Sequence, residues 1–170
     1  MRTVAGFLDD DPYTGVAKGM DRSSLPKGAE VNATGVRLAN NMLESLDGLA
    51  DFLERVLDDP LELRWLDLSN NRLTTVDPVL LAYPKLSCLY LQGNKIAKLA
   101  DVEALAAAPA LSKITVQDNP CQRKKDYRLR VAAALPRLRS LDVIAITKED
   151  RARADAYARM RAERSLREQR

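Results

Sequence analysis

The feature that most constrains the fold of this chain is a short pattern, L-x-x-L-x-L-x-x-N-x-L, which occurs four times, the first copy more loosely than the others and with other apolar residues at some leucine positions. The four copies occupy residues 33–43, 63–73, 86–96 and 111–121. Their asparagines are Asn41, Asn71, Asn94 and Asn119, so the copies follow one another at intervals of 30, 23 and 25 residues. Recurrence at about 20 to 29 residues indicates a chain that stacks repeated structural units, and the longer first interval predicts an insertion there, in the form of a longer helix.

Each position of the pattern has a physical reason. The two inner leucines alternate along a strand, so both point to one face while their neighbours point to the other. The asparagine amide can satisfy backbone groups that water does not reach where the chain turns back. One unit buries too little apolar surface to offset the entropy of ordering it, and stacking removes that deficit. The predicted fold is an α/β solenoid: a short leucine-rich-repeat horseshoe with a parallel concave sheet, short convex helices, a C-terminal cap and a trailing helix.

The segments between and after the copies predict helices and an ending. Residues 45–58 have apolar side chains at helical spacing, Asp77-Pro78 has the form of a helix start, and 101–108 and 126–135 are also predicted to be helical. Residues 135–143 predict a degenerate strand, as expected of a terminal repeat that shields the core. We expect four parts: an extended N-terminal arm (1–30), four repeats (31–121), a C-terminal cap (122–146) and a charged helix or tail (147–170).

Composition argues against catalysis and against a membrane location. The sequence contains no histidine, which removes the commonest general base and most zinc sites, and it has no glycine-rich phosphate loop. We therefore predict no catalytic, cofactor-binding or metal-ligating residues and no small-molecule substrate. No segment approaches the roughly 20 apolar residues of a membrane helix, and the first residues have no secretory signal, so we expect a cytoplasmic protein. Its two cysteines, Cys88 and Cys121, are then expected to be reduced.

The net charge of +3 lies in the C-terminal segment, where residues 147–170 contain eight Lys or Arg and five Asp or Glu. The remainder is balanced, which argues against a broad nucleic-acid surface. A capping box, Thr147 to Asp150, predicts a helix from Lys148 that lacks a wide apolar stripe. Such a helix is either solvated or becomes ordered on a partner. The predicted tail contacts are Arg159, Arg161 and Arg164.

The repeat arithmetic also predicts which side chains form the concave face. Residues beside the two inner leucines point outward, and among them Trp65 and Tyr90 are of the types enriched at interface hot spots. We predict that they anchor a partner protein, while charged neighbours set its register. The alternative is that Trp65 packs on its own neighbours or beneath the N-terminal arm. The predicted partner-binding residues are Arg37, Trp65, Asp67, Tyr90, Gln92, Lys113 and Thr115.

Two stretches extend beyond the repeat pattern and indicate relatives. The ending from Tyr127-Arg128 through Leu135-Pro136-x-Leu138-x-x-Leu141-Asp142 is similar to the C-terminal cap of several small adaptors, namely phosphatase regulators, the splicing protein U2 A-prime and a light chain of axonemal outer-arm dynein. Residues 57–80 and 86–94, with Ile146-Thr147-Lys148-Glu149-Asp150-Arg151, resemble a family of small leucine-rich-repeat proteins of the motile-cilium axoneme. This second resemblance runs from about residue 38 to 160.

The resemblance implies a non-catalytic structural or docking subunit of the cilium or flagellum. Its expected partners are axonemal coiled-coil, dynein or tubulin subunits, and its expected location is the cytoplasm and the axoneme. Two alternatives stay open: a cytosolic regulatory adaptor such as a phosphatase-targeting subunit, and an RNA-associated scaffold like the splicing protein.

Overall fold

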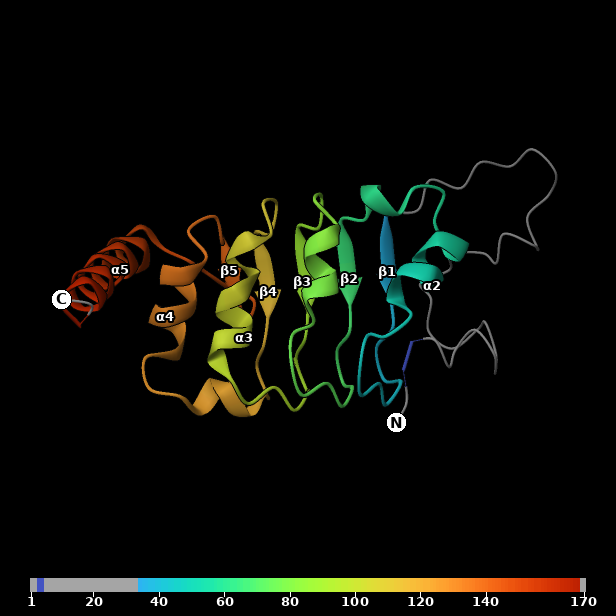
Figure 1. Ribbon diagram of the computed structural model, residues 1–170, viewed down its shortest axis with the longest axis horizontal. Coiled ribbons are helices and arrows are strands. Elements are labelled where there is room, and N and C mark those ends of the chain that lie inside the picture. The colour runs from blue at the N-terminus through green and yellow to red at the C-terminus, as the bar shows by residue number, and fades with distance from the viewer. Residues whose placement is uncertain (1–2, 5–33, 169–170) are drawn as a thin grey trace.

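The computed structural model describes residues 3–4 and 34–168. Within these residues the chain forms one six-stranded sheet whose strands follow the order of the sequence, with helices along one face (Figure 1). The strands are β1 (Gly35–Arg37), β2 (Trp65–Asp67), β3 (Cys88–Tyr90), β4 (Lys113–Thr115), β5 (Ser140–Leu141) and β6 (Ile144–Ala145). β1 to β5 pair in parallel and β6 pairs antiparallel with β5. The predicted α/β solenoid with a parallel sheet is confirmed.

Short helices return the chain from each strand to the next. They are α2 (Leu49–Val56), η2 (Pro60–Glu62), η3 (Pro78–Ala82), α3 (Leu99–Glu103), η4 (Ala104–Ala107), η5 (Pro120–Arg123) and α4 (Tyr127–Ala134). A longer helix, α5 (Lys148–Glu168), follows the last strand. The elements labelled η are 3-10 turns. The insertion in the first interval does hold a longer helix, α2, followed by η2. Asp77 caps η3 as predicted, because its carboxylate accepts a hydrogen bond from Val79 N at 2.8 Å.

Two helix predictions were wrong in their bounds. The helix predicted over 45–58 is shorter, because Gly48 has φ of +82° and the chain becomes helical only at Leu49. The helix predicted over 101–108 begins at Leu99 and changes from α to 3-10 geometry at Ala104. Apolar spacing locates the buried face of such a segment but does not distinguish α from 3-10 turns over so few residues.

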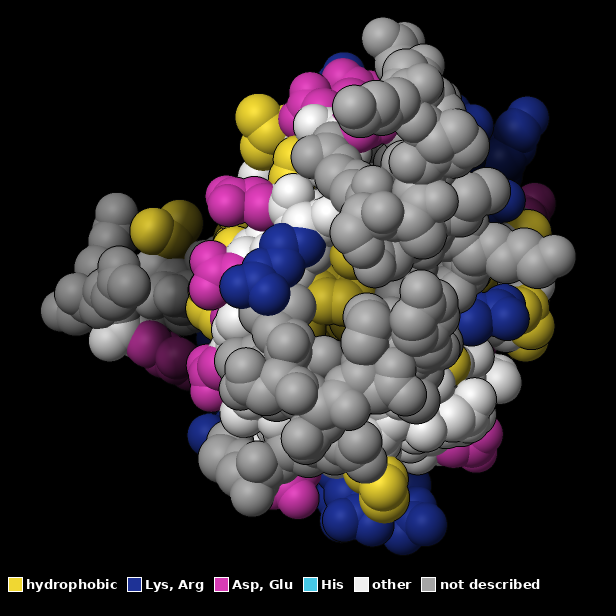
Figure 2. All heavy atoms as spheres, turned by 90° about the vertical axis from the view of Figure 1, so that its right-hand side faces the viewer, with side chains coloured by type: hydrophobic (Ala, Val, Ile, Leu, Met, Phe, Trp, Pro, Cys, Tyr) yellow, Lys and Arg dark blue, Asp and Glu magenta, His cyan; other side chains and the backbone are white. Residues whose placement is uncertain are grey.

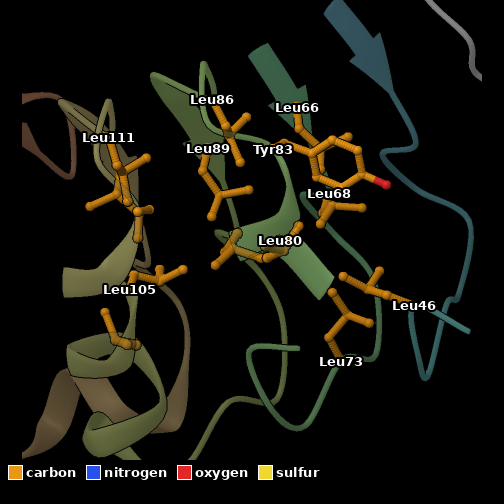
Figure 3. Packing of buried hydrophobic residues seen from close by; sticks show 14 of the residues in the cluster. Leu46, Leu66, Leu68, Leu73, Leu80, Tyr83, Leu86, Leu89, Leu105 and Leu111 are labelled. Carbon is orange, nitrogen blue, oxygen red and sulfur yellow. The ribbon is translucent and has the colours of Figure 1, made fainter. Parts of the chain in front are cut away.

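The core lies between the sheet and the helices and runs without interruption from the first repeat to the cap. Each of the four repeats contributes its inner pair, such as Leu66 of β2 and Leu68 directly after it, and these side chains are buried. Figure 3 shows Leu80 of η3 lying opposite Leu66, Leu68 and Leu89, so neighbouring repeats share one core. At roughly 1.5–3 kcal/mol for each buried leucine, this shared burial accounts for the stability that one repeat lacks.

Asparagine side chains join each repeat to the one before it. The Nδ2 group of Asn94 donates to two backbone carbonyls, Leu91 O in its own repeat (2.9 Å) and Leu68 O in the preceding repeat (3.0 Å). Its Oδ1 accepts from Leu73 N, also in the preceding repeat, at 3.0 Å. The same arrangement recurs at Asn71 and Asn119. The asparagines therefore stack through buried backbone groups rather than through one another.

The residue before each asparagine has a left-handed backbone. These residues are Asn40, Asn70, Gly93 and Asp118, with φ of +63°, +53°, +69° and +59°. Asn, Asp and Gly are the residue types that adopt this conformation most readily. Gly93 has a second reason, because a Cβ there would lie 2.3 Å from Asn70 Oδ1. This turn presents the asparagine amide to the interior.

The cap replaces the missing asparagine with an aspartate. Asp142 Oδ1 accepts hydrogen bonds from Val116 N (2.7 Å) and Gln117 N (2.9 Å), both in the fourth repeat. Its Oδ2 accepts from the hydroxyl of Tyr127 on α4 at 2.9 Å. Burial, followed by the charge of Asp142, raises the pKa of the Tyr127 phenol well above its usual value, so Tyr127 remains a donor. The degenerate last strand is thus tied to the repeat before it.

The trailing helix α5 packs against α4 of the cap (Figure 1). The predicted capping box is present, since Asp150 N donates to Thr147 Oγ1 (3.0 Å) and Thr147 N donates to Asp150 Oδ2 (3.1 Å). Ala154 is fully buried, and Arg151 donates to the backbone oxygens of Ala132 (2.5 Å) and Leu138 (2.8 Å). The first half of the helix is therefore ordered by its own chain.

The predicted N-terminal arm, residues 1–30, lies outside the described residues except for Thr3 and Val4. Val4 is fully buried in the core. The boundaries predicted at residues 30, 121 and 146 remain predictions. Among the described residues, none of the helices is both long and apolar enough to cross a membrane.

Candidate protein-binding surface

The concave face of the sheet carries two columns of outward side chains, one from the first residue of each strand and one from the third. Pairing between strands aligns the first column as Gly35, Trp65, Cys88, Lys113 and Ser140. The second column is Arg37, Asp67, Tyr90 and Thr115. The repeat arithmetic therefore placed these residues correctly in the sheet. Adjacent members stand about 4.8 Å apart along each column.

The centre of this face is an aromatic pair with a cation beside it. The rings of Trp65 and Tyr90 meet edge to face, with centroids 5.8 Å apart and planes at 65°. The guanidinium carbon of Arg37 lies 5.7 Å from the Trp65 ring centroid, and Arg37 Nε donates to Asp67 Oδ2 at 3.2 Å. Edge-to-face rings and a cation over an aromatic face are each favourable arrangements. This cluster, Arg37 with Trp65 and Tyr90, is called the aromatic cluster below.

Sequence reasoning missed the role of Gly35 beside Trp65. A Cβ at Gly35 would lie 3.0 Å from Trp65 Cε3, closer than an ordinary contact, so a larger residue there would push the ring from its present position. Trp65 is partly exposed and contacts its neighbours, as the alternative prediction held, but it keeps an accessible surface. The signal was a glycine that the alignment of the repeats places directly opposite the only tryptophan of the chain.

Two of the predicted contact residues, Asp67 and Thr115, lie in the second column as expected, but both are buried. Their side chains form hydrogen bonds with neighbouring residues of the same face. Asp67 is 7% exposed, and its Oδ1 accepts from the backbone N (3.0 Å) and the hydroxyl (2.6 Å) of Ser69. Thr115 is 5% exposed and donates its hydroxyl to Gln92 Oε1. Among the predicted contact residues, those that remain accessible are Arg37, Trp65, Tyr90, Gln92 and Lys113.

The exposed charges on this face are positive. Arg37 and Lys113 are exposed and lie on strands at either side of the aromatic pair. Asp67 in the second column accepts from Arg37 and Ser69, and Asp142, which directly follows β5, accepts from the fourth repeat and Tyr127. Arg37 is therefore already paired with a carboxylate, and the surface offers aromatic area beside Lys113, which forms no ion pair with the described residues.

The predicted tail contacts lie on α5, and two of them pair within the chain. Arg161 Nη1 lies 3.3 Å from Glu103 Oε2, and Glu103 also binds Arg130 at 2.7 Å. Arg164 Nε lies 2.8 Å from Glu168 Oε1 one helical turn away. Arg159 is exposed and makes no ion pair with the described residues. Arg161 thus helps to hold the second half of the helix near α3.

Both cysteines are free thiols; Cys88 is partly exposed on the concave face, and burial raises the pKa of the Cys121 thiol. The described residues contain no group of three or more His, Cys, Asp or Glu side chains arranged to hold a metal.

Comparisons with known proteins agree with the geometry. The family model described as "Leucine-rich repeat" matches residues 28–169. Leucine-rich repeat-containing protein 51 of Mus musculus is 42% identical over 163 residues, which cover 94% of this chain and 81% of the relative. The U2 small nuclear ribonucleoprotein A' of Arabidopsis thaliana is 39% identical over 88 residues, which cover 51% of this chain and 35% of that protein.

A solved structure shows the same fold. The crystal structure of the Drosophila melanogaster SNF/U2A' complex matches with a TM-score of 0.62 and 26% identity, covering 80% of this chain and 87% of that chain. The tandem repeats, the continuous core and these similarities lead to one assignment. The chain belongs to the leucine-rich-repeat family, among the relatives of leucine-rich repeat-containing protein 51, and is a repeat module of the kind that binds other proteins.

Proposed function

We propose that this chain is a non-catalytic docking subunit of the ciliary or flagellar axoneme, and that it holds its partner on the concave face. The observation that carries the proposal is the aromatic cluster, which stays partly exposed at the centre of a rigid parallel sheet. Trp, Tyr and Arg supply most of the binding energy in protein interfaces when they lie at the centre of the patch.

The surface also indicates the chemistry of the partner. Aromatic area beside Lys113, an exposed cation that forms no ion pair with the described residues, fits a segment that presents apolar side chains next to a carboxylate. The axonemal location is supported by resemblance to small leucine-rich-repeat proteins of motile cilia, through the residues after the repeats as well as the repeats themselves. We expect the partner to be a dynein, tubulin or coiled-coil subunit.

The test is to follow the tagged chain in ciliated cells after separating cilia into membrane, matrix and salt-resistant axoneme. We expect the wild type in the axoneme. Trp65→Ala should move it into the matrix fraction while the melting temperature stays nearly unchanged, because Trp65 keeps an exposed surface and lies outside the core. Trp65→Phe, which keeps an aromatic ring, should retain part of the binding.

Leu61→Ala is the matched control, because Leu61 is 55% exposed and lies in η2, outside the sheet. It should remain in the axoneme. A wild-type chain found outside the axoneme would refute the location, and a Trp65→Ala variant that stays in the axoneme would refute the concave face. A large loss of stability in Trp65→Ala would instead give Trp65 a structural role.

A second candidate, an RNA-associated scaffold, is favoured by the similarity to the U2 A' proteins. It predicts that the tagged chain co-purifies with small nuclear RNA and that RNA binding weakens steeply as salt is raised. A phosphatase catalytic subunit in the same purification would instead support the regulatory-adaptor alternative. Tubulin or dynein chains would support the axonemal proposal.

A further inference from the structure

A second surface lies at the edge of the solenoid where the strands end and the chain turns back, the lower edge in Figure 1. Six cationic side chains occupy the turns of the last three repeats and the start of the cap, and all six are exposed. They are Arg72, Lys95, Lys98, Arg123, Lys124 and Lys125. These six residues are called the basic edge. The net charge of residues 1–146 gave no sign of this cluster, because acidic residues elsewhere in that part of the sequence offset its positive charge.

Backbone hydrogen bonds place these turns next to one another. Lys95 N donates to Leu73 O at 2.9 Å, directly after Arg72, and Cys121 N donates to Ile96 O at 2.9 Å, directly after Lys95. Successive repeats therefore bring Arg72, Lys95 and the 120–125 turn into adjacent positions. Figure 2 shows Lys and Arg side chains gathered at the lower edge, while Asp and Glu side chains lie mainly elsewhere on that view.

Within the described residues, the cations of the basic edge have no carboxylate partner, whereas several other cations do. Arg37, Lys85, Arg128 and Arg130 each lie within ion-pair distance of a carboxylate. None of the six edge cations forms an ion pair with any residue in the ranges 3–4 and 34–168. Segments 92–100 and 117–126 contain only two acids, Asp118 and Asp126. Like charges held on neighbouring turns repel one another, so an anionic partner would relieve a cost that the free chain bears.

We propose that the basic edge binds an acidic polypeptide segment of a partner protein. Three observations favour a polypeptide over a nucleic acid. Segments 92–100 and 117–126 contain no aromatic residue on which a base could stack. Asp118 and Asp126 stand among the cations, where they repel a continuous phosphate backbone but tolerate a peptide whose carboxylates are spaced apart. The turns that flank the edge also expose Met42 and Pro120, which offer apolar contact to side chains between the carboxylates.

This surface is separate from the concave face, so the proposal does not depend on the proposed function. The test is the fluorescence anisotropy of a labelled glutamate-rich peptide titrated with the full chain. A peptide of equal length with glutamine in place of glutamate serves as the uncharged control. We expect saturable binding of the glutamate peptide that weakens as salt is raised, and no binding of the glutamine peptide.

The variant Lys95→Glu/Arg123→Glu/Lys124→Glu should lower the affinity for the glutamate peptide by roughly tenfold or more. Three contacts between an edge cation and a peptide carboxylate become repulsive together. The matched control Arg55→Glu/Arg159→Glu/Arg167→Glu changes the net charge equally at exposed positions on α2 and on the second half of α5. It should lose about twofold or less. If the charge reversal impairs folding, Lys95→Gln/Arg123→Gln/Lys124→Gln removes the same charges without reversing them and should also bind the glutamate peptide more weakly than the control variant does.

Equal weakening in the edge and control variants would overturn the proposal, because binding would then follow net charge alone. The same experiment with an RNA and a DNA duplex of matched charge separates the classes of partner. Tighter binding of either nucleic acid than of the peptide, lost in the edge variant, would overturn the choice of a polypeptide. Trp65→Ala should leave peptide binding unchanged, which separates this surface from the concave one.

Discussion

Replacing Asn94 with alanine tests how the repeats are held together. Asn94 is 6% exposed and makes three hydrogen bonds to backbone groups. Leu73 N has no other hydrogen-bond acceptor among the described residues, so the substitution leaves a buried donor unsatisfied. The two carbonyls each keep one hydrogen bond after the substitution, because Leu68 O also accepts from Asn71 Nδ2 (2.9 Å) and Leu91 O also accepts from Asn119 Nδ2 (2.8 Å).

The magnitude follows from these three bonds. An orphaned buried donor costs about 1–3 kcal/mol, and each carbonyl that keeps one of two bonds loses a net bond of about 0.5–1.5 kcal/mol. Asn94→Ala should therefore lower the free energy of unfolding by about 2–6 kcal/mol. Since small domains are stable by about 5–15 kcal/mol, this is a large fraction of the total.

The assay is urea denaturation followed by far-UV circular dichroism, with Trp65 fluorescence as a second probe of the neighbouring repeat. Asn41→Ala is the matched control, because Asn41 is 7% exposed but its side chain makes one hydrogen bond with the described residues, to Ala39 O at 3.0 Å. We expect a loss of about 1 kcal/mol there. Equal losses in the two variants would refute the bridging role of the asparagine amide.

Two further predictions concern the cap. Tyr127→Phe removes the hydrogen bond to the Asp142 carboxylate and should destabilise the chain by about 1–3 kcal/mol in chemical denaturation; an unchanged midpoint would show that Asp142 is held by the backbone alone. The Arg128 guanidinium, which donates to Asp150, lowers the pKa of that carboxyl, so the ionised form is favoured in the folded state. The resulting stabilisation is present above the unfolded pKa of about 3.9 and is lost as pH falls through the folded pKa. Melting temperatures of wild type and Asp150→Asn should therefore converge on acidification, and a constant difference would contradict this.

Much of the fold was predictable because the pattern encodes both the strand faces and the turn. The alternation of Leu66 and Leu68 gave the buried face, and counting from them placed Trp65 and Asp67 on the concave side with the correct neighbours. Aligning the repeats also gave the pairing of Trp65 with Cys88, because parallel strands of equal repeats pair at equivalent positions.

Other features depend on contacts between repeats that no local pattern reveals. Asp67 was predicted to be available to a partner, but it is buried because Arg37 and Ser69 bind its carboxylate. The docking of α5 was left open because its contact with the cap uses the small side chain of Ala154 and the hydrogen bonds of Arg151 instead of an apolar stripe. Hydrophobic periodicity detects large apolar side chains. It detects neither polar side chains buried by hydrogen bonds nor a helix that packs through an alanine and an arginine.

The direction of the asparagine bonds bears on how molecules of this kind change in length. Each asparagine amide forms hydrogen bonds with the backbone of the preceding coil. A duplicated coil inserted between Asn71 and Asn94 would therefore contain the asparagine that binds it to the coil before it. Its own backbone would accept the hydrogen bonds of the next asparagine. Neither terminus would need to be altered, because Asp142 closes whichever coil comes last. Duplication would then separate the two ends by about 4.8 Å for every strand added, which makes the solenoid an adjustable spacer between whatever its ends attach.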